Sequence, residues 1–152
     1  MELEPAAEND LVRILELQKK AFHGQALIYN DFYLQSLTQT LDDLKRELSL
    51  KTIYKVVLDE TIIASIRCYV RDRTLFIEKL IVDPDYQNKG IGSQVMHAIE
   101  NKYAATVTCY ELSTGHKSAC NLHLYKKLGY KEIRRELLND NCDLIVMRKR
   151  TR

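Results

Sequence analysis

The sequence has few glycine and proline residues, and its charges nearly cancel. Its 5 Gly and 2 Pro among 152 residues exclude a collagen-like or linker-dominated chain, and a hydrophobic content of 45% excludes intrinsic disorder. The 23 basic and 21 acidic residues leave a formal net charge of +2. That charge is too small for a protein that coats nucleic acid or an anionic membrane. The length fits one compact domain over residues 1–152.

Long apolar runs and targeting signals are also missing. No stretch approaches the roughly 20 apolar residues that a membrane-spanning helix requires. Residues 1–5 lack the basic and apolar regions of a signal peptide. We therefore expect a cytoplasmic protein that binds neither membranes nor nucleic acid. The basic tail, residues 148–152, is expected to be a solvated terminus.

Cysteine is sparse and shows no disulfide or metal-binding pattern. The four residues are Cys68, Cys109, Cys120 and Cys142. No two of them form a Cys-x-x-Cys pair, so we expect reduced thiols. His116, Cys120 and His123 have a spacing that a helix brings together, but His116 lies ahead of the expected helix start. The sequence therefore predicts no metal site.

Hydrophobic spacing predicts two helices in the first third of the chain. Residues 1–6 are a short candidate strand, and Asn9 or Asp10 is expected to cap a helix that Gly24 ends. A second helix is indicated by leucines at a spacing of four, three and four: Leu37, Leu41, Leu44 and Leu48. Both helices are expected before the first long strand.

From Lys51 onwards the pattern predicts a mixed sheet. β-rich runs at residues 52–58, 61–70 and 74–82 are separated by breaks so short that they require antiparallel hairpins. Helices at 90–103 and 118–128 then alternate with strands at 106–112, 130–135 and 143–148. The fold class is therefore α/β (α+β), with a mixed, mostly antiparallel central sheet of about six to seven strands flanked by about four helices.

The turn after the third β-rich run has the architecture of an anion site. The strand breaks at Pro84, and the chain enters a helix through Gly90 and Gly92. The first N–H groups of a helix have no internal partners and carry about half a positive charge, and glycine lets a phosphate approach them closely. A Walker A loop is excluded because no Gly-Lys-Ser/Thr follows. The dinucleotide fingerprint fails because its third glycine position holds Val95.

Residues further along the chain complete a known pattern. The order strand, Gln-x-x-Gly-x-Gly, helix, strand is followed by Asn-x-x-x-Tyr-x-x-Leu-Gly-Tyr over residues 121–130. This order resembles the GNAT superfamily of N-acetyltransferases, most specifically from Phe76 to Tyr130. The resemblance implies a GNAT-like fold and acetyl-CoA as co-substrate, without a metal.

The resemblance also implies which residues bind acetyl-CoA. The pyrophosphate loop of the family corresponds to Gln87, Asn88, Lys89, Gly90, Ile91, Gly92 and Ser93. The pantetheine arm would pair with the main chain of Leu80, Ile81 and Val82. Asn121 and Tyr125 correspond to the family's Asn and Tyr, and their spacing of four puts both on the helical face that would point at the thioester.

Two residues are implied to be catalytic. An acceptor ammonium with a pKa of about 10.4 must lose a proton before it attacks, and Glu78 matches the family's base, acting directly or through water. The alternative is that Glu78 is an outward-facing strand carboxylate paired with a Lys or Arg. Tyr125 is the candidate proton donor to the departing thiolate. The alternative is an aromatic ring in the core whose hydroxyl bonds to the backbone.

The predicted function is transfer of acetyl from acetyl-CoA to a primary amine, by direct attack in a ternary complex. The alternative is a non-catalytic acyl-CoA-binding sensor or regulatory module. The acceptor, a small-molecule or peptide amine, would bind between residues 23–33 and 136–141. There Tyr29, Asp31 and Tyr33 are candidates for an aromatic and acidic cup, with a solvated loop as the alternative. The sequence leaves the oligomeric state open, a homodimer included.

Overall fold

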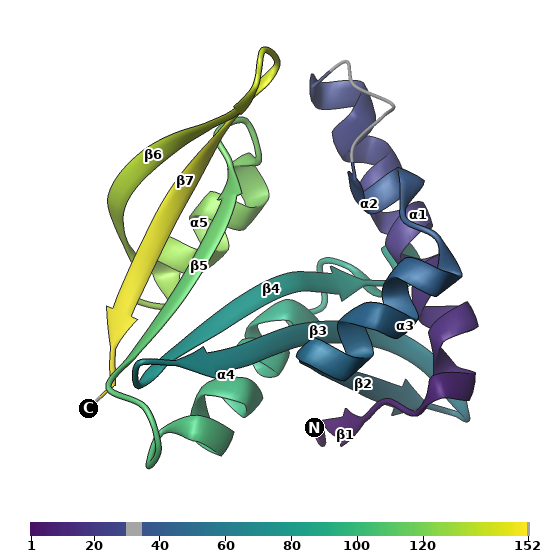
Figure 1. Cartoon of the computed structure of the whole chain (residues 1–152). Coiled ribbons are helices and arrows are strands. Elements are labelled where there is room, and N and C mark those ends of the chain that lie inside the picture. The colour runs from purple at the N-terminus through teal and green to yellow at the C-terminus, as the bar shows by residue number, and fades with distance from the viewer. Residues whose placement is uncertain (30–34, 152) are drawn as a thin grey trace.

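The computed structural model describes residues 1–29 and 35–151, and its centre is one seven-stranded sheet (Figure 1). The strand order is β1-β2-β3-β4-β5-β7-β6. The pair β4 and β5 is parallel, and every other pair is antiparallel. The strands are β1 (Glu4–Pro5), β2 (Thr52–Leu58), β3 (Thr61–Arg71), β4 (Thr74–Val82), β5 (Cys109–Gly115), β6 (Lys131–Asn139) and β7 (Cys142–Arg150). The predicted mixed, mostly antiparallel sheet is confirmed.

Helices cover both faces of the sheet (Figure 1). The helices are α1 (Leu11–Tyr29), α2 (Gln35–Thr38), α3 (Leu41–Leu50), α4 (Ile91–Tyr103) and α5 (Ala119–Lys127). One apolar core joins α1 and α3 to Ile53, Ile62 and Ile81 of the sheet. A second core joins α4 and α5 to the opposite face. Among the described residues, no helix is both long and apolar enough to span a membrane.

Two helix predictions need correction. Gly24 does not end the first helix, which continues to Tyr29. Ala26 and Tyr29 are buried beyond it, and this packing outweighs the cost of about 1 kcal/mol that a glycine adds inside a helix. The helix predicted over residues 37–48 is divided between α2 and α3. Thr40 caps α3 by accepting a hydrogen bond from the Asp43 N–H at 3.2 Å.

Two strand predictions also shift. The strand expected over residues 106–112 is β5, which starts at Cys109, because the N–H groups of Thr106 and Val107 still bond to the Tyr103 carbonyl at the end of α4. Most of the segment 136–141, expected as a loop, belongs to β6, which runs to Asn139.

Asp10 closes a short 3-10 turn ahead of α1 by accepting the Ala7 N–H at 2.8 Å.

The β2–β3 and β3–β4 connections are tight hairpins, as predicted. Each uses two residues with positive φ: Asp59 and Glu60 in the first turn, Asp72 and Arg73 in the second. A pair of left-handed residues is the turn whose twist matches that of the flanking strands. These hairpins fix the register of β3 with its neighbours β2 and β4.

The strands β4 and β5 diverge soon after they pair. Their register contains three pairs, Thr74↔Cys109, Leu75↔Tyr110 and Phe76↔Glu111. Beyond Phe76, β4 continues beside β3, while β5 continues beside β7 (Figure 1). The backbone of β4 that faces β5 is therefore left without a strand partner beyond this point.

A bulge in β4 changes which side chains face each side of the sheet. Arg67 pairs with Glu78 and Ser65 pairs with Ile81, so two β4 residues stand opposite one β3 residue. Within the bulge, Lys79 has a left-handed backbone with φ 49°. Ile81 consequently packs against α1 and α3, while Leu80 packs against the opposite core.

Candidate active site

The residues implied for acetyl-CoA gather around one cavity of about 270 Å³ at the C-terminal end of β4. There it borders the wedge that opens between β4 and β5 beyond Phe76. The lining includes Leu80, Val82, Gln87, Asn88, Gly90, Ile91, Gly92, Ser93 and Asn121. Three residues of the implied set do not line this cavity: Ile81, Lys89 and Tyr125, the last of which lines a second cavity. Ile81 is 1% exposed and belongs to the core under α1 and α3. Lys89 is exposed, and its ammonium lies 5.4 Å from the centre of the Tyr86 ring.

The loop that enters α4 presents its backbone to this cavity. Asn88 and Gly90 have left-handed backbones, with φ 61° and 78°, a region that glycine and asparagine tolerate best. Gly90 is the residue before the first turn of α4 and has no side chain to cap it. The first N–H groups of α4 are thus available to an anion.

Gly92, in the first turn of α4, lies against the wall of the cavity. A Cβ built on Gly92 would lie 3.5 Å from Leu124 Cδ2 and 3.8 Å from Leu80 Cδ2. Both distances are ordinary van der Waals contacts. Alanine therefore fits, whereas the two methyl groups of valine would fill space between these leucines and the loop.

The edge of β4 offers backbone groups to the wedge. The Asp83 N–H bonds to Ile63 of β3, and because successive strand residues point their polar groups to alternate sides, Val82 and Leu80 face the wedge. The Gln87 side chain donates to the Val82 carbonyl at 3.0 Å. An unpaired strand edge beside an uncapped helix start fits a ligand that has amides at one end and phosphates at the other, which is the constitution of coenzyme A.

A second cavity, of about 450 Å³, continues from the first. Leu80 and Asn121 line both cavities. The second is enclosed by α1, β4, β5, α5 and the β6–β7 hairpin, through residues that include Phe22, Glu78, Thr114, Tyr125 and Leu138. Asn121 is held between the two by its amide, which donates to Thr114 Oγ1 at 3.4 Å.

Tyr125 forms part of the wall of this second cavity. Its ring is 7% exposed and packs edge-on against Tyr130, with the ring centres 6.0 Å apart. Within the described residues its hydroxyl has no hydrogen-bond partner. The alternative interpretation placed the ring in the core, which the packing shows, and bonded the hydroxyl to the backbone, which the structure does not show. Burial raises the pKa of Tyr125 to about 12. The hydroxyl therefore keeps its proton at neutral pH.

Glu78 lines the second cavity and is also ion-paired. Its Oε2 accepts the Lys51 ammonium at 2.6 Å. Lys51 also contacts Glu47 at 3.3 Å, and Glu47 pairs with Arg67 at 2.7 Å. The lysine partner of the alternative interpretation is thus present, and Glu78 also lines the second cavity.

The chain of ion pairs from Glu78 through Lys51 and Glu47 ends at a buried arginine, Arg67. Arg67 is fully buried, and besides Glu47 it contacts the side chains of Gln18 and Gln39. Its Nε has no hydrogen-bond partner among the described residues. A buried guanidinium needs compensating carboxylates, so Arg67 orients Glu47 and, through Lys51, Glu78.

Lys79 is a titratable group in the cavity that the sequence did not single out. The β4 bulge brings it into the lining beside Glu78. Burial, together with the positive charge of Arg67, lowers the pKa of Lys79 to about 8. The signal was present in the sequence, because two consecutive charged residues inside an otherwise apolar strand indicate a break in its alternation.

Tyr29 connects the end of α1 to the turn between β5 and α5. Its hydroxyl accepts the Lys117 N–H at 2.8 Å and shares a 2.9 Å hydrogen bond with Ser118 Oγ. A Cβ on Gly115 would lie 2.2 Å from this hydroxyl, so any other residue there must displace the Tyr29 ring. Of the predicted aromatic and acidic cup, Tyr29 thus borders the cavity, while Asp31 and Tyr33 lie outside the described residues.

The cysteines are free thiols. Cys68, Cys109 and Cys142 are buried, and Cys120 is exposed beside the first cavity. Within residues 1–29 and 35–151, no group of three His, Cys, Asp or Glu side chains could hold a metal ion.

The chain matches the model of a known protein family. The model described as the acetyltransferase (GNAT) family matches residues 11–130. The chain therefore belongs to the GNAT acetyltransferase family, as the motifs of residues 76–130 predicted. By this membership it is an acetyl-CoA-dependent N-acetyltransferase.

Solved structures share the fold at low sequence identity. The protein smu.2055 from Streptococcus mutans UA159 superposes with a TM-score of 0.83 at 14% identity, over 100% of both chains. The ribosomal-protein-S18-alanine N-acetyltransferase from Escherichia coli gives 0.81 at 15%, over 99% of this chain and 93% of that chain. The PaiA N-acetyltransferase from Thermoplasma acidophilum, solved with coenzyme A, gives 0.77 at 19%, over 99% of both chains. No curated protein sequence matches the chain.

Proposed function

We propose that acetyl-CoA binds in the first cavity and that a primary amine attacks it directly from the second. The observation that supports this most strongly is the junction of the two cavities at Leu80 and Asn121. The pyrophosphate would lie on the backbone of residues 88–93 and the pantetheine along Leu80 and Val82, which puts the thioester at the junction. Acetyl-CoA supplies the activated carbonyl carbon.

Glu78 is the proposed proton acceptor for the amine. Its Oε2 is held by Lys51, and Oε1 has no hydrogen-bond partner among the described residues, so it can receive a proton directly or through one water. Lys51 and Arg67 orient this carboxylate and are positioning residues. Deprotonating a lysine-like amine at pH 7 costs about 4.6 kcal/mol, which a positioned base partly offsets.

Tyr125 is the proposed proton donor to the sulfur that leaves. A thiolate with a pKa of about 8.5 is a better leaving group when a neighbouring acid protonates it. The raised pKa of Tyr125 keeps the donor protonated. Asn121, held on Thr114, would orient the same end of the cofactor.

The acceptor enters between α1 and the β6–β7 hairpin, and its class is a small-molecule or peptide amine. The Escherichia coli neighbour is named as a ribosomal-protein-S18-alanine N-acetyltransferase, so a protein acceptor is kept among the candidates.

Three expectations stay predictions of the sequence. They are one domain over residues 1–152, a cytoplasmic location and, as one of the oligomeric states it allows, a homodimer.

A broad amine panel with thiol detection tests the proposal. Steady CoA release that depends on both acetyl-CoA and one of the amines supports the enzyme. Tight acetyl-CoA binding by calorimetry without release with any amine would favour the sensor module instead.

Direct attack has its own test. Cys120 lies beside the first cavity, so an acetyl-cysteine route is the competing mechanism. Intersecting double-reciprocal plots and retained turnover in Cys120→Ala are expected. Parallel plots, or loss of turnover in a folded Cys120→Ala protein, would replace direct attack by a two-step route.

A further inference from the structure

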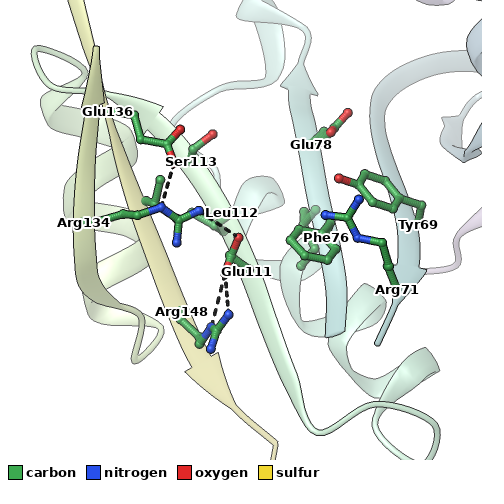
Figure 2. A pocket seen from close by; sticks show the side chains of 12 residues that line it. Tyr69, Arg71, Phe76, Glu78, Glu111, Leu112, Ser113, Arg134, Glu136 and Arg148 are labelled. Atoms are coloured by element: carbon green, nitrogen blue, oxygen red, sulfur yellow. Dashed lines mark hydrogen bonds and ion pairs between the residues drawn. The ribbon is translucent and has the colours of Figure 1, made fainter. Parts of the chain in front are cut away.

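A third cavity, of about 430 Å³, adjoins the second cavity. Figure 2 shows the side chains that line it. Ile77, Glu78 and Ser113 line both. It lies on the face of the sheet that α1 and α3 cover further along, where β4 and β5 begin to diverge. An acceptor whose amine reaches Glu78 therefore has room to extend into it.

Most charges in this third cavity are already paired. Glu111 accepts Arg148 at 2.7 Å and lies 3.7 Å from Arg134, and Arg134 also bonds to Glu136 at 2.7 Å (Figure 2). Glu78 is paired with Lys51 outside the cavity. These carboxylates are thus neutralised by cations that the protein itself supplies.

Arg71 is the exception. Within the described residues it has no carboxylate partner, and its guanidinium lies 5.2 Å from the centre of the Phe76 ring. Phe76 in turn stacks on Tyr69, with an angle of 11° between the ring planes. Figure 2 shows this stack on the wall opposite Arg134 and Arg148. A guanidinium supported on an aromatic face keeps its N–H edge available for a bidentate anion.

We propose that the acceptor carries a carboxylate, which Arg71 binds while the amine lies at Glu78. The inference rests on the proposed function and adds the class of acceptor. Phe76 and Glu78 are two residues apart on β4, which is about 7 Å at the rise of a strand. With the guanidinium over Phe76, the amine and the carboxylate lie about 7 to 10 Å apart. An extended peptide spans up to about 3.6 Å per residue, so a dipeptide or tripeptide with a free C-terminus fits.

Glycine peptides of one to four residues test the proposal, each as the free acid and as the C-terminal amide. Turnover is followed by thiol release at saturating acetyl-CoA, and rates are compared per neutral amine using each acceptor's measured pKa. For the dipeptide and tripeptide we expect kcat/KM to favour the acid about tenfold, which is about 1.4 kcal/mol. The preference should fall at high salt, because Arg71 is exposed.

Two variants assign the preference to a residue. Arg71→Gln should bring the acid-to-amide ratio to about one, and Arg71→Lys should retain part of it. Arg73→Gln is the matched control, since Arg73 is an exposed arginine of the same hairpin that does not line the cavity. It should keep the wild-type ratio.

The outcomes separate this inference from the proposed function. A ratio near one at every length, a preference that survives Arg71→Gln, or turnover of other amines without turnover of these peptides overturns the carboxylate site alone. Absence of turnover with every amine removes the proposed function as well.

Discussion

Replacing Tyr125 by phenylalanine separates the catalytic role of this residue from its packing role. The change removes only the hydroxyl and keeps the ring that packs against Tyr130 at 6.0 Å. Because no described residue bonds to the hydroxyl, its loss leaves no protein group unsatisfied. The free energy of unfolding should therefore stay within about 1 kcal/mol of the wild type.

The expected loss is in turnover. General acid catalysis contributes about 10²-fold or more, so kcat should fall by at least that factor, which is about 2.7 kcal/mol in activation free energy. The affinity for acetyl-CoA should change little. With a pKa of about 12, Tyr125 stays protonated below pH 10, so the loss should be uniform across the neutral range.

Tyr130→Phe is the matched control with the opposite pattern. The Tyr130 hydroxyl donates to the buried Glu100 at 2.9 Å, and removing one partner of a buried hydrogen bond costs about 1 to 3 kcal/mol. Urea unfolding should show this loss while turnover stays near that of the wild type. The assay uses an accepted amine near saturation. Near-wild-type kcat in Tyr125→Phe would refute the acid role and leave water as the proton source.

Substitutions at three further positions test the loop, the cavity wall and the charged cluster. Gly92→Val should weaken acetyl-CoA binding at least tenfold by calorimetry, while Gly92→Ala stays close to the wild type; equal affinities would remove the loop from the site. Gly115→Ala should cost about 1 to 3 kcal/mol by displacing Tyr29 and should raise the acceptor KM; unchanged unfolding and KM would contradict that contact. The pKa of Lys79 is about 8 in the folded protein, so from about pH 8 to 10 the folded protein binds fewer protons than the unfolded chain. The free energy of unfolding should therefore rise with pH in that window relative to Lys79→Met. A pH-independent difference in urea unfolding would contradict the burial of its charge.

Local patterns predicted the elements that depend on local physics. The two hairpins, α4 and α5 follow from turn residues and spacing close in the sequence, and so does the glycine loop. The end of α1 does not, because the buried face that carries it past Gly24 is completed by distant residues such as Ser118, the partner of Tyr29. The division between α2 and α3 depends on Thr40, whose capping role competes with an uninterrupted leucine spacing.

The site was predictable where residues act through the backbone or through a motif, and less so where the fold brings charges together. The motif indicated Glu78, but its partner Lys51 lies on the segment between α3 and β2 and could not be identified without the register of the sheet. Lys79 required the bulge, which moves it into the cavity. The carboxylate site at Arg71 depends on the divergence of β4 and β5 and on which of the surrounding charges are already paired.

In the proposed mechanism, an amine and acetyl-CoA meet where the two cavities join and react without an acetylated enzyme. The most direct measurement is mass spectrometry of the products after incubation with isotope-labelled acetyl-CoA and an accepted amine, for the wild type and Glu78→Gln. The expected result is a labelled N-acetyl product, no labelled protein after a chase without amine, and a turnover at least about tenfold lower in Glu78→Gln. A labelled cysteine that transfers its acetyl group to the amine on chase, or full turnover in Glu78→Gln, would contradict it.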